Sequence, residues 1–549
     1  MTYKTVHPSP FNDKAFLAAA LGAFMFGASI GSGAAHAQDA REPIWPTKEW
    51  QTSSPEEQGM DSKELAKLVD FGTTLSLDSL LVVRHGKIVA EAYYAPYAAG
   101  IPHAVYSATK AVISTLMSIA SKDGLLDSPS HRVLDFFDRR SIANLDDRKK
   151  AITVQSLLDM TSGIEWRMPD SMFEMERSPD WVKFVLDRPM SSAPGDVFNY
   201  SNGNPHLLSA IITKLTGMSA LEYGKAKLFG PLGINDLSWG HDPQGISNGG
   251  QGLYLQPRDM AKIGYLYLRN GAWEGKRLLP SDWIDKVTHA TVDPHDPGEP
   301  EFRYSNLFWV LPDKHVYMAS GYHGQVIMVF PDLDVVAVTT GRDNYPLSKL
   351  AGYISSLVKS DTALPPDAAS ANLLANKILD GSTEKPTGVG GTPGMAAIIS
   401  GKVYRFPPNA INVKSLSLIL TDPQPHYDME SYAKDATKSG SRFTGPIGLG
   451  GLYRKGELTD YGFDGRIGGL PRINAVKGTW QDDHTFVIDT LILGQGRPAE
   501  RWTLTFDGEK LNVRVKLEDG DAISMDSERA DKHSVVPSQS THKGFSTRR

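Results

Sequence analysis

The first part of the chain changes its hydrophobic pattern several times, and each change predicts a different kind of element. Helical spacing of apolar residues begins at Asp61, and two extended runs follow at 79–84 and 87–93, separated by a His-Gly turn. A long apolar helix is predicted to open near Ser107 and to close at 122–124, where a glycine supplies the stop.

The chain then passes through helices and returns to strands. Residues 150–290 show helical patterns joined by long connections, and a further helix is predicted at about 347–359. Four extended runs lie between them, at 307–311, 316–319, 326–330 and 335–340. Because strands come from both ends of this region and helices from its middle, we expect an α/β fold of α+β type, with helices packed on one antiparallel sheet.

The pattern changes again after residue 360. Prolines at 365–366 and a glycine-rich stretch at 388–394 predict a linker over 363–394. The chain beyond it is rich in extended runs, at 396–399, 415–420, 486–492, 501–506 and 511–517. With an Asp-Gly hairpin signal at 507–508, these runs predict a separate all-β domain of barrel or sandwich type over 395–529.

Both ends of the chain differ from the regions between them. Residues 1–37 contain a weakly positive start, an apolar core too short for a bilayer span, and the small-x-small site Ala35-His36-Ala37. This order predicts a cleavable secretory signal, and the polar, basic residues 530–549 predict a disordered tail. We expect a periplasmic or secreted bacterial protein without a stable membrane anchor, whose main domain spans 38–362.

Composition narrows the chemistry more than it narrows the fold. The chain has 549 residues, of which 40% are hydrophobic and 22% charged, as in ordinary globular proteins. Its formal net charge of -6 provides no general field for attracting nucleic acid or anionic lipid. The absence of cysteine excludes disulfides, thiolate metal sites and a cysteine nucleophile. A covalent nucleophile must therefore be oxygen or nitrogen.

Ser107 and Lys110 are the first candidates for catalysis. A lysine three residues after a serine lies on the same helix face, and a partly buried amine with a lowered pKa can activate the serine. Ser-x-x-Lys also occurs at 356–359, 382–385, 431–434 and 540–543. Ser107 alone begins a long apolar helix, so this pair is expected at a helix N-terminus, where the dipole favours developing negative charge.

A second candidate is the tripeptide Tyr200-Ser201-Asn202. A tyrosine hydroxyl can relay a proton, and an asparagine amide can orient a lysine and a substrate. The same tripeptide recurs at 304–306, where it opens a predicted strand, whereas the first copy precedes a helix predicted at 205–215. Site residues are often displayed where a loop enters a helix, which favours the first copy.

The third candidate is the segment Gly321-Tyr322-His323-Gly324-Gln325, expected on the strand that enters 326–330. A glycine in a strand lets a substrate approach the backbone, and a neighbouring amide would complete an oxyanion hole with the amide of Ser107. A buried or edge histidine is the commoner meaning of such a segment.

Aromatic and methionine residues crowd the segment after Gly163. They show poor helical periodicity, and they are Trp166, Met168, Met172, Phe173, Met175 and Trp181. We interpret the segment as an apolar lid or pocket wall over the site, suited to an aliphatic or aromatic substrate. Ordinary core packing is the alternative.

Other chemical signals are weaker. Gly-x-Ser-x-Gly at 245–249 has polar residues before it and glycines after it, so the strand-turn-helix of a nucleophile elbow is not expected there. The stretch 293–297, Asp-Pro-His-Asp-Pro, reads as an exposed loop, and His-Glu-x-x-His does not occur. We therefore expect neither a metal nor a cofactor.

In this order the three candidate segments resemble the serine β-lactamase and penicillin-binding protein superfamily. The likeness is closest to its class C-like branch, with esterases, D-aminopeptidases and 6-aminohexanoate-dimer hydrolases. Stretches at 156–164, 257–264 and 330–332 strengthen the match, which covers about 55–360. The resemblance implies that Ser107 is acylated, Lys110 is its base, Tyr200 is the proton shuttle and Asn202 is a supporting amide.

The third motif of that superfamily is often Lys-Thr-Gly or His-Thr-Gly, and Tyr322-His323-Gly324 stands in its place. Because the lysine that holds a substrate carboxylate is missing, the resemblance favours a broader ester or amide hydrolase. We place this motif, Gln325 and Trp166 in substrate binding. His323 would supply positive charge only at a pH near or below about 6.5, the ordinary pKa of histidine.

The sequence hypothesis is thus a serine hydrolase that acts on a small ester, amide or peptide-like substrate through an acyl-enzyme on Ser107. One alternative is a β-lactamase or D-alanyl-D-alanine carboxypeptidase. Another is a non-catalytic cell-wall or penicillin-binding protein that uses its β-domain for binding. The actual substrate, the role of the β-domain and the oligomeric state stay open.

Overall fold

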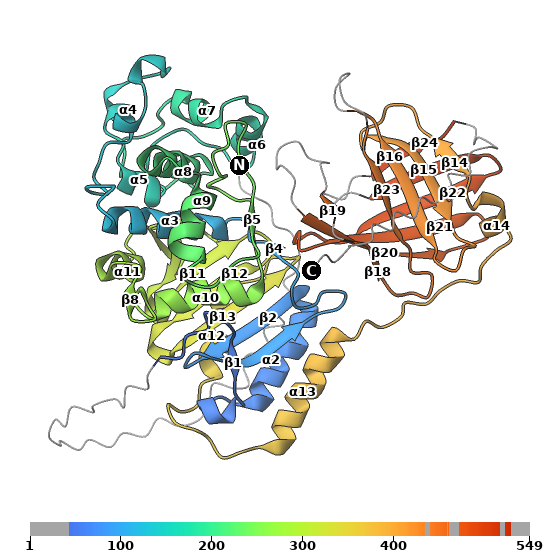
Figure 1. The fold of residues 1–549 in the computed structure, drawn as a ribbon, viewed down its shortest axis with the longest axis horizontal. Coiled ribbons are helices and arrows are strands. Elements are labelled where there is room, and N and C mark those ends of the chain that lie inside the picture. Colours follow the sequence, from blue (N-terminus) through green and yellow to red (C-terminus); the bar gives the residue numbers. More distant parts are fainter. Residues whose placement is uncertain (1–42, 434–439, 458, 461–470, 517–521, 529–549) are drawn as a thin grey trace, which may run out of the picture. The chain divides into compact units, whose positions relative to one another are not determined.

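The computed structural model describes residues 43–433, 440–457, 459–460, 471–516 and 522–528 (Figure 1). They form two compact units. The described part of the first unit comprises the residues up to Thr383 and the stretch Gly494–Arg497, and the second unit comprises the others. The predicted signal segment, 1–37, and the predicted tail, 530–549, lie outside the described residues.

Within the described residues, an eight-stranded sheet organises the first unit. Its spatial order is β1 (Gln51–Thr52), β3 (Lys87–Tyr93), β2 (Leu77–Arg84), β13 (Val335–Gly341), β12 (Gln325–Phe330), β11 (Val316–Gly321), β10 (Phe308–Leu311) and β9 (Arg303–Ser305). The two-residue β1 runs parallel to β3, and the other neighbouring strands of this sheet are antiparallel. The pairing of β2 with β13 joins the two ends of the region, which confirms the predicted antiparallel sheet.

Helices cover both faces of this sheet, because successive residues of each strand point to opposite sides. One face packs with α3 (Ala108–Lys122) and α10 (Pro257–Leu268) through residues such as Leu81 and Ile327, and α8 (Gly203–Thr216) packs on α3 in the same core. The other face packs with α2 (Ser62–Thr74), α12 (Leu347–Ser356) and α13 (Ala368–Ser382) through residues such as Leu80 and Met328 (Figure 1).

Shorter elements complete the first unit. The further α-helices are α4 (Asp147–Lys150), α5 (Val154–Leu158), α6 (Asp170–Arg177), α7 (Trp181–Asp187), α9 (Ala220–Gly224) and α11 (Ser281–Thr288). A three-stranded sheet has the order β4 (His103–Ala104), β6 (Leu253–Leu255) and β5 (Ser238–Trp239), and β7 (Ala272–Trp273) pairs with β8 (Lys276–Arg277). Single tight or wide helical turns lie at Glu56–Gln58, Val133–Phe136, Arg139–Ser141, Lys225–Phe229, Pro312–Lys314 and Pro331–Leu333.

Local signals account for several boundaries that were predicted. The carboxylate of Asp61 caps α2 by accepting the amides of Lys63 at 2.8 Å and Glu64 at 3.1 Å. The His-Gly turn between β2 and β3 has positive φ at both residues, 50° and 76°, as a two-residue hairpin turn requires.

The predicted linker contains a helix that the sequence reading missed. Residues of α13 pack on α2, where Leu374 is buried and Lys377 forms an ion pair with Asp70 at 2.8 Å. The prolines at 365–366 precede the cap of this helix, Asp367, whose side chain accepts the amide of Ser370. They therefore mark the start of a helix, and the expected loose connection is shorter than 363–394.

The second unit is an antiparallel β structure with one short helix among its described residues. One sheet has the order β14 (Val403–Arg405), β15 (Val413–Ile419), β16 (His426–Ser431) and β17 (Arg442–Pro446). The other has the order β18 (Arg454–Lys455), β20 (Pro471–Trp480), β21 (Thr485–Leu493), β22 (Glu500–Asp507), β23 (Lys510–Lys516) and β24 (Ala522–Asp526), and β19 (Thr459–Asp460) pairs with β20. Apolar residues of both sheets share one core, which confirms the expected all-β character.

One predicted strand of this unit is wrong. Residues 396–399 belong to the helix α14 (Met395–Ile399). A short apolar run such as Ala-Ala-Ile-Ile fits a buried helix as well as a strand, so periodicity alone does not decide between them.

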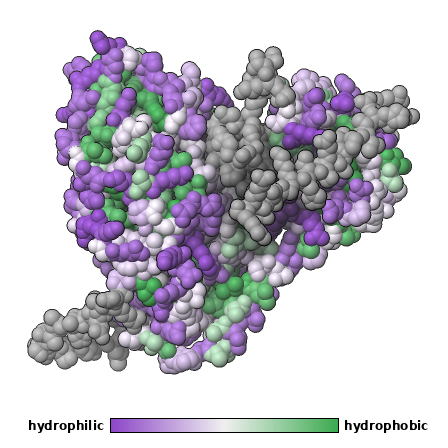
Figure 2. All heavy atoms as spheres, in the orientation of Figure 1, coloured by the Kyte–Doolittle hydropathy of each residue, from purple (hydrophilic) through white to green (hydrophobic). Residues whose placement is uncertain are grey.

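The surface of the first unit is largely polar on the face shown, and hydrophobic residues gather over α13 (Figure 2). Leu373 and Leu379 of this helix are 40% and 62% exposed. Among the described residues, no helix combines the length and the apolar character that a membrane span needs.

Candidate active site

Ser107 directly precedes the first residue of α3, at the helix N-terminus where the sequence predicts it. The amide of Ala108 donates to the carbonyl of Val105, and the amide of Lys110 donates to the carbonyl of Ser107, both at 3.0 Å. Every residue of α3 from Ala108 to Ala120 is buried. The core therefore fixes the turn that carries both Ser107 and Lys110.

Gly321, at the end of β11, lies against this turn. A Cβ atom at Gly321 would stand 2.2 Å from the carbonyl oxygen of Val105 and 3.2 Å from the amide nitrogen of Ala108. The sequence reading assigned this glycine to the close approach of a substrate. Instead, the turn that carries Ser107 makes the close approach, and any larger residue at position 321 would displace it.

The Lys110 amine lies at the centre of a buried cluster. Its Nζ is 2.9 Å from Ser107 Oγ, 2.7 Å from Asn202 Oδ1 and 2.8 Å from the carbonyl oxygen of Gly250. The residue is only 1% exposed. Burial lowers the pKa of Lys110 well below the usual value for lysine, because the charged form loses its hydration.

These three contacts determine how a neutral amine would be oriented. The Asn202 and Gly250 oxygens can only accept hydrogen bonds, so they hold the two N–H groups of a neutral amine. Of the three partners, only the hydroxyl of Ser107 can donate. The lone pair of a deprotonated Lys110 therefore faces the Ser107 proton, which is the arrangement that a general base needs.

The Tyr200-Ser201-Asn202 segment leads into α8. The hydroxyl of Ser201 accepts the amides of Gly203 at 3.0 Å and Asn204 at 3.3 Å, so it caps the helix. With Ser201 in that role, the amide side chain of Asn202 is left to contact Lys110. Ser201 therefore caps the helix and Asn202 contacts Lys110, and the sequence spacing alone does not show which residue does which.

Tyr200 stands on the other side of the amine. The Nζ of Lys110 is 4.8 Å from the centre of its ring, and the ring stacks on Trp309 at a centroid distance of 6.0 Å. Burial raises the pKa of Tyr200 to about 12, and a hydrogen bond with Ser107 offsets part of that rise. The phenol is therefore protonated at neutral pH and can donate a hydrogen bond or relay a proton.

Residues 322–324 form a turn between β11 and β12, whereas the sequence reading placed them on a strand. Gly321 pairs with Gln325, and His323 and Gly324 have positive φ values of 58° and 79°. Two successive residues with positive φ reverse the chain tightly, so the strand ends at Gly321. The ring of Tyr322 is 52% exposed and stacks on His323 at 3.6 Å.

His323 and Gln325 are buried within this turn. The Nδ1 atom of His323 is 2.6 Å from the carbonyl oxygen of Gly496, which belongs to the same compact unit, so Nδ1 carries a proton. The side-chain amide of Gln325 donates to the carbonyls of His323 at 3.0 Å and Gly341 at 2.7 Å. Gln325 therefore holds the turn together.

Trp166 lies in the core, where ordinary packing was the alternative interpretation. It is 4% exposed, and a Cβ atom at Gly203 would stand 2.8 Å from its ring. Its indole contacts the sulfur of Met168, and its carbonyl accepts a hydrogen bond from Asn199. The side chain of Trp166 therefore packs against the first turn of α8.

The Gly-x-Ser-x-Gly segment forms a loop, as expected, and it holds no nucleophile elbow. Ser247 is 2% exposed, and its hydroxyl accepts the amide of Leu221 at 3.1 Å. The carbonyl of Gly250, just after this segment, is a contact of Lys110 that sequence reasoning missed. A backbone carbonyl has no side-chain signature, so no motif could have revealed it.

Comparison with known proteins identifies the family. A model of the beta-lactamase family matches residues 73–353. The chain belongs to this family. A 6-aminohexanoate-dimer hydrolase of Paenarthrobacter ureafaciens is 23% identical over 281 residues, which cover 48% of this chain and 71% of that protein.

Two solved structures are similar to this family member. The octameric penicillin-binding protein homologue from Pyrococcus abyssi is 16% identical, with a TM-score of 0.44, and the match covers 85% of this chain and 99% of that one. A D-stereospecific amidohydrolase from Streptomyces sp. is 17% identical, with a TM-score of 0.43, and the match covers 54% of this chain and 98% of that one.

The beta-lactamase family is one of serine hydrolases, and the domain of 73–353 contains the cluster around Lys110. Within the described part of the chain, no group of three or more histidine, aspartate or glutamate side chains is arranged to hold a metal ion.

Proposed function

We propose that this family member hydrolyses ester or amide bonds of small substrates through an acyl-enzyme on Ser107. The observation that carries the proposal is the arrangement around Lys110. Two acceptor-only oxygens hold its amine, and the remaining partner is a serine hydroxyl at 2.9 Å. Burial lowers the pKa of that amine, which favours the neutral form that a base requires.

The proposed reaction begins with transfer of the Ser107 proton to the neutral amine of Lys110. The serine oxygen then bonds to the substrate carbonyl carbon, and the carbonyl π electrons move to its oxygen. The amide of Ser107, in the first turn of α3, is a donor for that oxyanion. Collapse of the intermediate expels the alcohol or amine, which receives the proton through Tyr200. Water repeats the sequence on the acyl-enzyme and releases the acid.

The turn at 322–324 supports a substrate without a carboxylate. It contains neither lysine nor arginine, and its exposed ring, Tyr322, lies edge-to-face with Tyr106 at 5.8 Å. The exposed ring of Tyr322 offers apolar surface to an uncharged group of the substrate. The relative from Paenarthrobacter is named for hydrolysis of an aminohexanoate dimer, which supports the inclusion of linear amides.

The experiment compares wild-type protein, Ser107→Ala and Ser247→Ala. We expect the first substitution to abolish turnover of a p-nitrophenyl ester and the second, in the Gly-x-Ser-x-Gly segment, to leave turnover intact. Mass spectrometry after fluorophosphonate treatment should locate the label on Ser107. Turnover retained by folded Ser107→Ala would overturn the mechanism. Nitrocefin turnover equal to ester turnover would instead favour a β-lactamase.

A further inference from the structure

The loop 240–252, between β5 and β6, carries the Gly250 carbonyl that contacts Lys110. Its buried residues include Asp242, Ser247 and Asn248, which are 1%, 2% and 2% exposed. This loop contains the Gly-Ile-Ser-Asn-Gly segment, 245–249, whose serine has no nucleophilic setting. The segment nonetheless forms buried hydrogen bonds, and those of Asn248 hold the peptide group whose carbonyl contacts Lys110.

Asn248 holds the peptide unit that faces Lys110. Its side-chain Oδ1 accepts the amides of Gly250 at 3.0 Å and Gln251 at 3.2 Å. The amide of Gln251 and the carbonyl of Gly250 belong to the same planar peptide group and point in opposite directions. Asn248 therefore holds one side of this peptide while Lys110 binds the other side at 2.8 Å.

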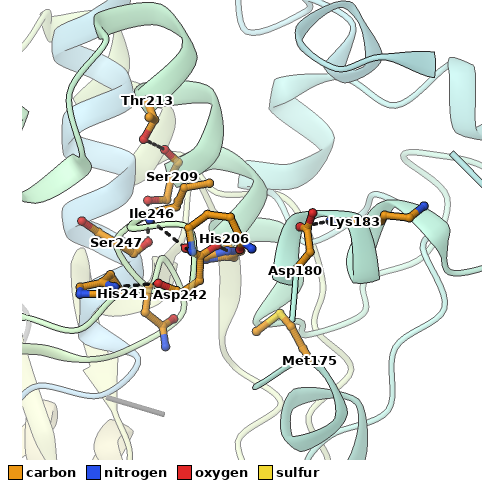
Figure 3. A network of polar contacts seen from close by, with 12 residues as sticks. Met175, Asp180, Lys183, His206, Ser209, Thr213, His241, Asp242, Ile246 and Ser247 are labelled. Carbon is orange, nitrogen blue, oxygen red and sulfur yellow. Dashed lines mark hydrogen bonds and ion pairs between the residues drawn. The ribbon is translucent and has the colours of Figure 1, made fainter. Parts of the chain in front are cut away.

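The loop is also tied to α8 at two points (Figure 3). His206 Nε2 is 3.2 Å from Asp242 Oδ2, and both side chains are fully buried. Further along, the hydroxyl of Ser209 donates to the carbonyl of Ser247 at 2.7 Å. Because Asn202 precedes the same helix, both acceptors of the Lys110 amine are positioned relative to α8.

Two glycines allow the loop to touch the first turn of α8. A Cβ atom at Gly249 would stand 2.0 Å from the carbonyl oxygen of Pro205. A Cβ atom at Gly250 would stand 2.8 Å from Cγ of Asn202, the other acceptor of Lys110. The contact between the loop and α8 therefore leaves no room for a side chain at either glycine.

We propose that Asn248 is a positioning residue, which aims the Gly250 carbonyl at Lys110 and so directs the amine's lone pair at Ser107. This inference rests on the proposed function, because it matters only if Lys110 acts as a base. The side-chain hydrogen bonds of Asn248 described above reach neither Ser107 nor the turn at 322–324. Asn248 therefore acts through the peptide group of Gly250.

The test measures the rate at which a fluorophosphonate labels Ser107, as a function of pH, in the full chain. Asn248→Ala frees the peptide, and we expect labelling to slow by about 10²-fold, as for a reacting group misplaced by about 1 Å. The side chains around the Lys110 amine are those of Ser107, Tyr200 and Asn202, and none of them carries a full charge. Losing the carbonyl dipole, which favours the ammonium form, should move the acid limb of the rate profile to lower pH.

Two variants sharpen this test. Asn248→Ser keeps a short side-chain oxygen that accepts amides two and three residues ahead, so it should restore much of the rate. Ser247→Ala removes the hydrogen bond that the Ser247 hydroxyl accepts from the amide of Leu221 in α9. This variant should leave both the rate and the acid limb as in wild type. Circular dichroism of each variant shows whether it is folded.

The outcomes separate the two proposals. If wild type is labelled at Ser107 and Asn248→Ala reacts like Ser247→Ala, the positioning role is wrong and the serine mechanism stands. If wild type is not labelled at Ser107, the mechanism is wrong and the positioning role with it. If Asn248→Ala does not fold, Asn248→Leu takes its place, because leucine also lacks an acceptor for the amides of Gly250 and Gln251. A rate and an acid limb equal to wild type in folded Asn248→Leu would overturn the inference.

Discussion

Replacing Lys110 with methionine tests whether the amine is neutral in the folded protein. Methionine is similar in length and apolar, so it fills the same buried space without a titrating group. The unfolded chain holds a lysine near its ordinary pKa of 10.5, whereas burial lowers the pKa in the folded protein. Between the two values, the unfolded chain binds a proton that the folded protein does not.

The sign of the pH effect follows from this difference. Stability rises with pH wherever the unfolded state binds more protons. The contribution of Lys110 to wild-type stability is therefore complete above its unfolded pKa and is lost as pH falls toward its folded pKa. Relative to Lys110→Met, wild type should gain stability as pH rises between the folded and the unfolded pKa of Lys110, by at most about 1.4 kcal/mol for each pH unit.

The assay is urea unfolding of the full chain, wild type and Lys110→Met, at several pH values in this range. Comparing the two proteins at each pH cancels the contributions of other titrating groups and of the second unit. Ser114→Ala is a matched control, since Ser114 is buried on α3 one turn further along and does not titrate. A wild-type advantage that does not change with pH would mean that Lys110 stays charged, and the lone-pair argument would fail.

Three further predictions concern the surroundings of the amine. Gly321→Ala places a Cβ 2.2 Å from the Val105 carbonyl oxygen and should lower kcat/KM for the ester by about 10²-fold. The control is Gly352→Ala, whose Cβ would lie 3.8 Å from its nearest atom and should leave kcat/KM unchanged. Equal kcat/KM in the two variants would contradict the close contact at Gly321. Trp166→Ala should lower the free energy of unfolding by about 3–5 kcal/mol in urea titrations, because the ring is buried, and a loss below about 1 kcal/mol would favour an open pocket wall. Nitrocefin should turn over at least about 10²-fold more slowly than a p-nitrophenyl ester, since the turn around His323 offers no lysine for a carboxylate, and comparable steady-state rates would refute this.

Local sequence signals were sufficient for most of the secondary structure of the first unit. The strands around 79–93 and 316–340 and the helix after Ser107 were predicted close to their observed bounds. Their signals are periodicity, turn residues and caps, all of which act within a few residues. The errors at α13 and α14 arose where such signals were ambiguous, since the prolines at 365–366 mark a helix start as readily as a linker.

The sequence by itself determined that the nucleophile could not be sulfur, that Ser107 and Lys110 share one helix turn, and that Tyr200 and Asn202 precede another helix. Only the tertiary structure decided what surrounds the amine. Gly250 is 140 residues from Lys110 along the chain, and its carbonyl is chemically identical to every other backbone carbonyl. The close contact at Gly321 and the burial of Trp166 also depend on which distant segments meet. Periodicity reports which way a residue faces, whereas packing decides what it faces.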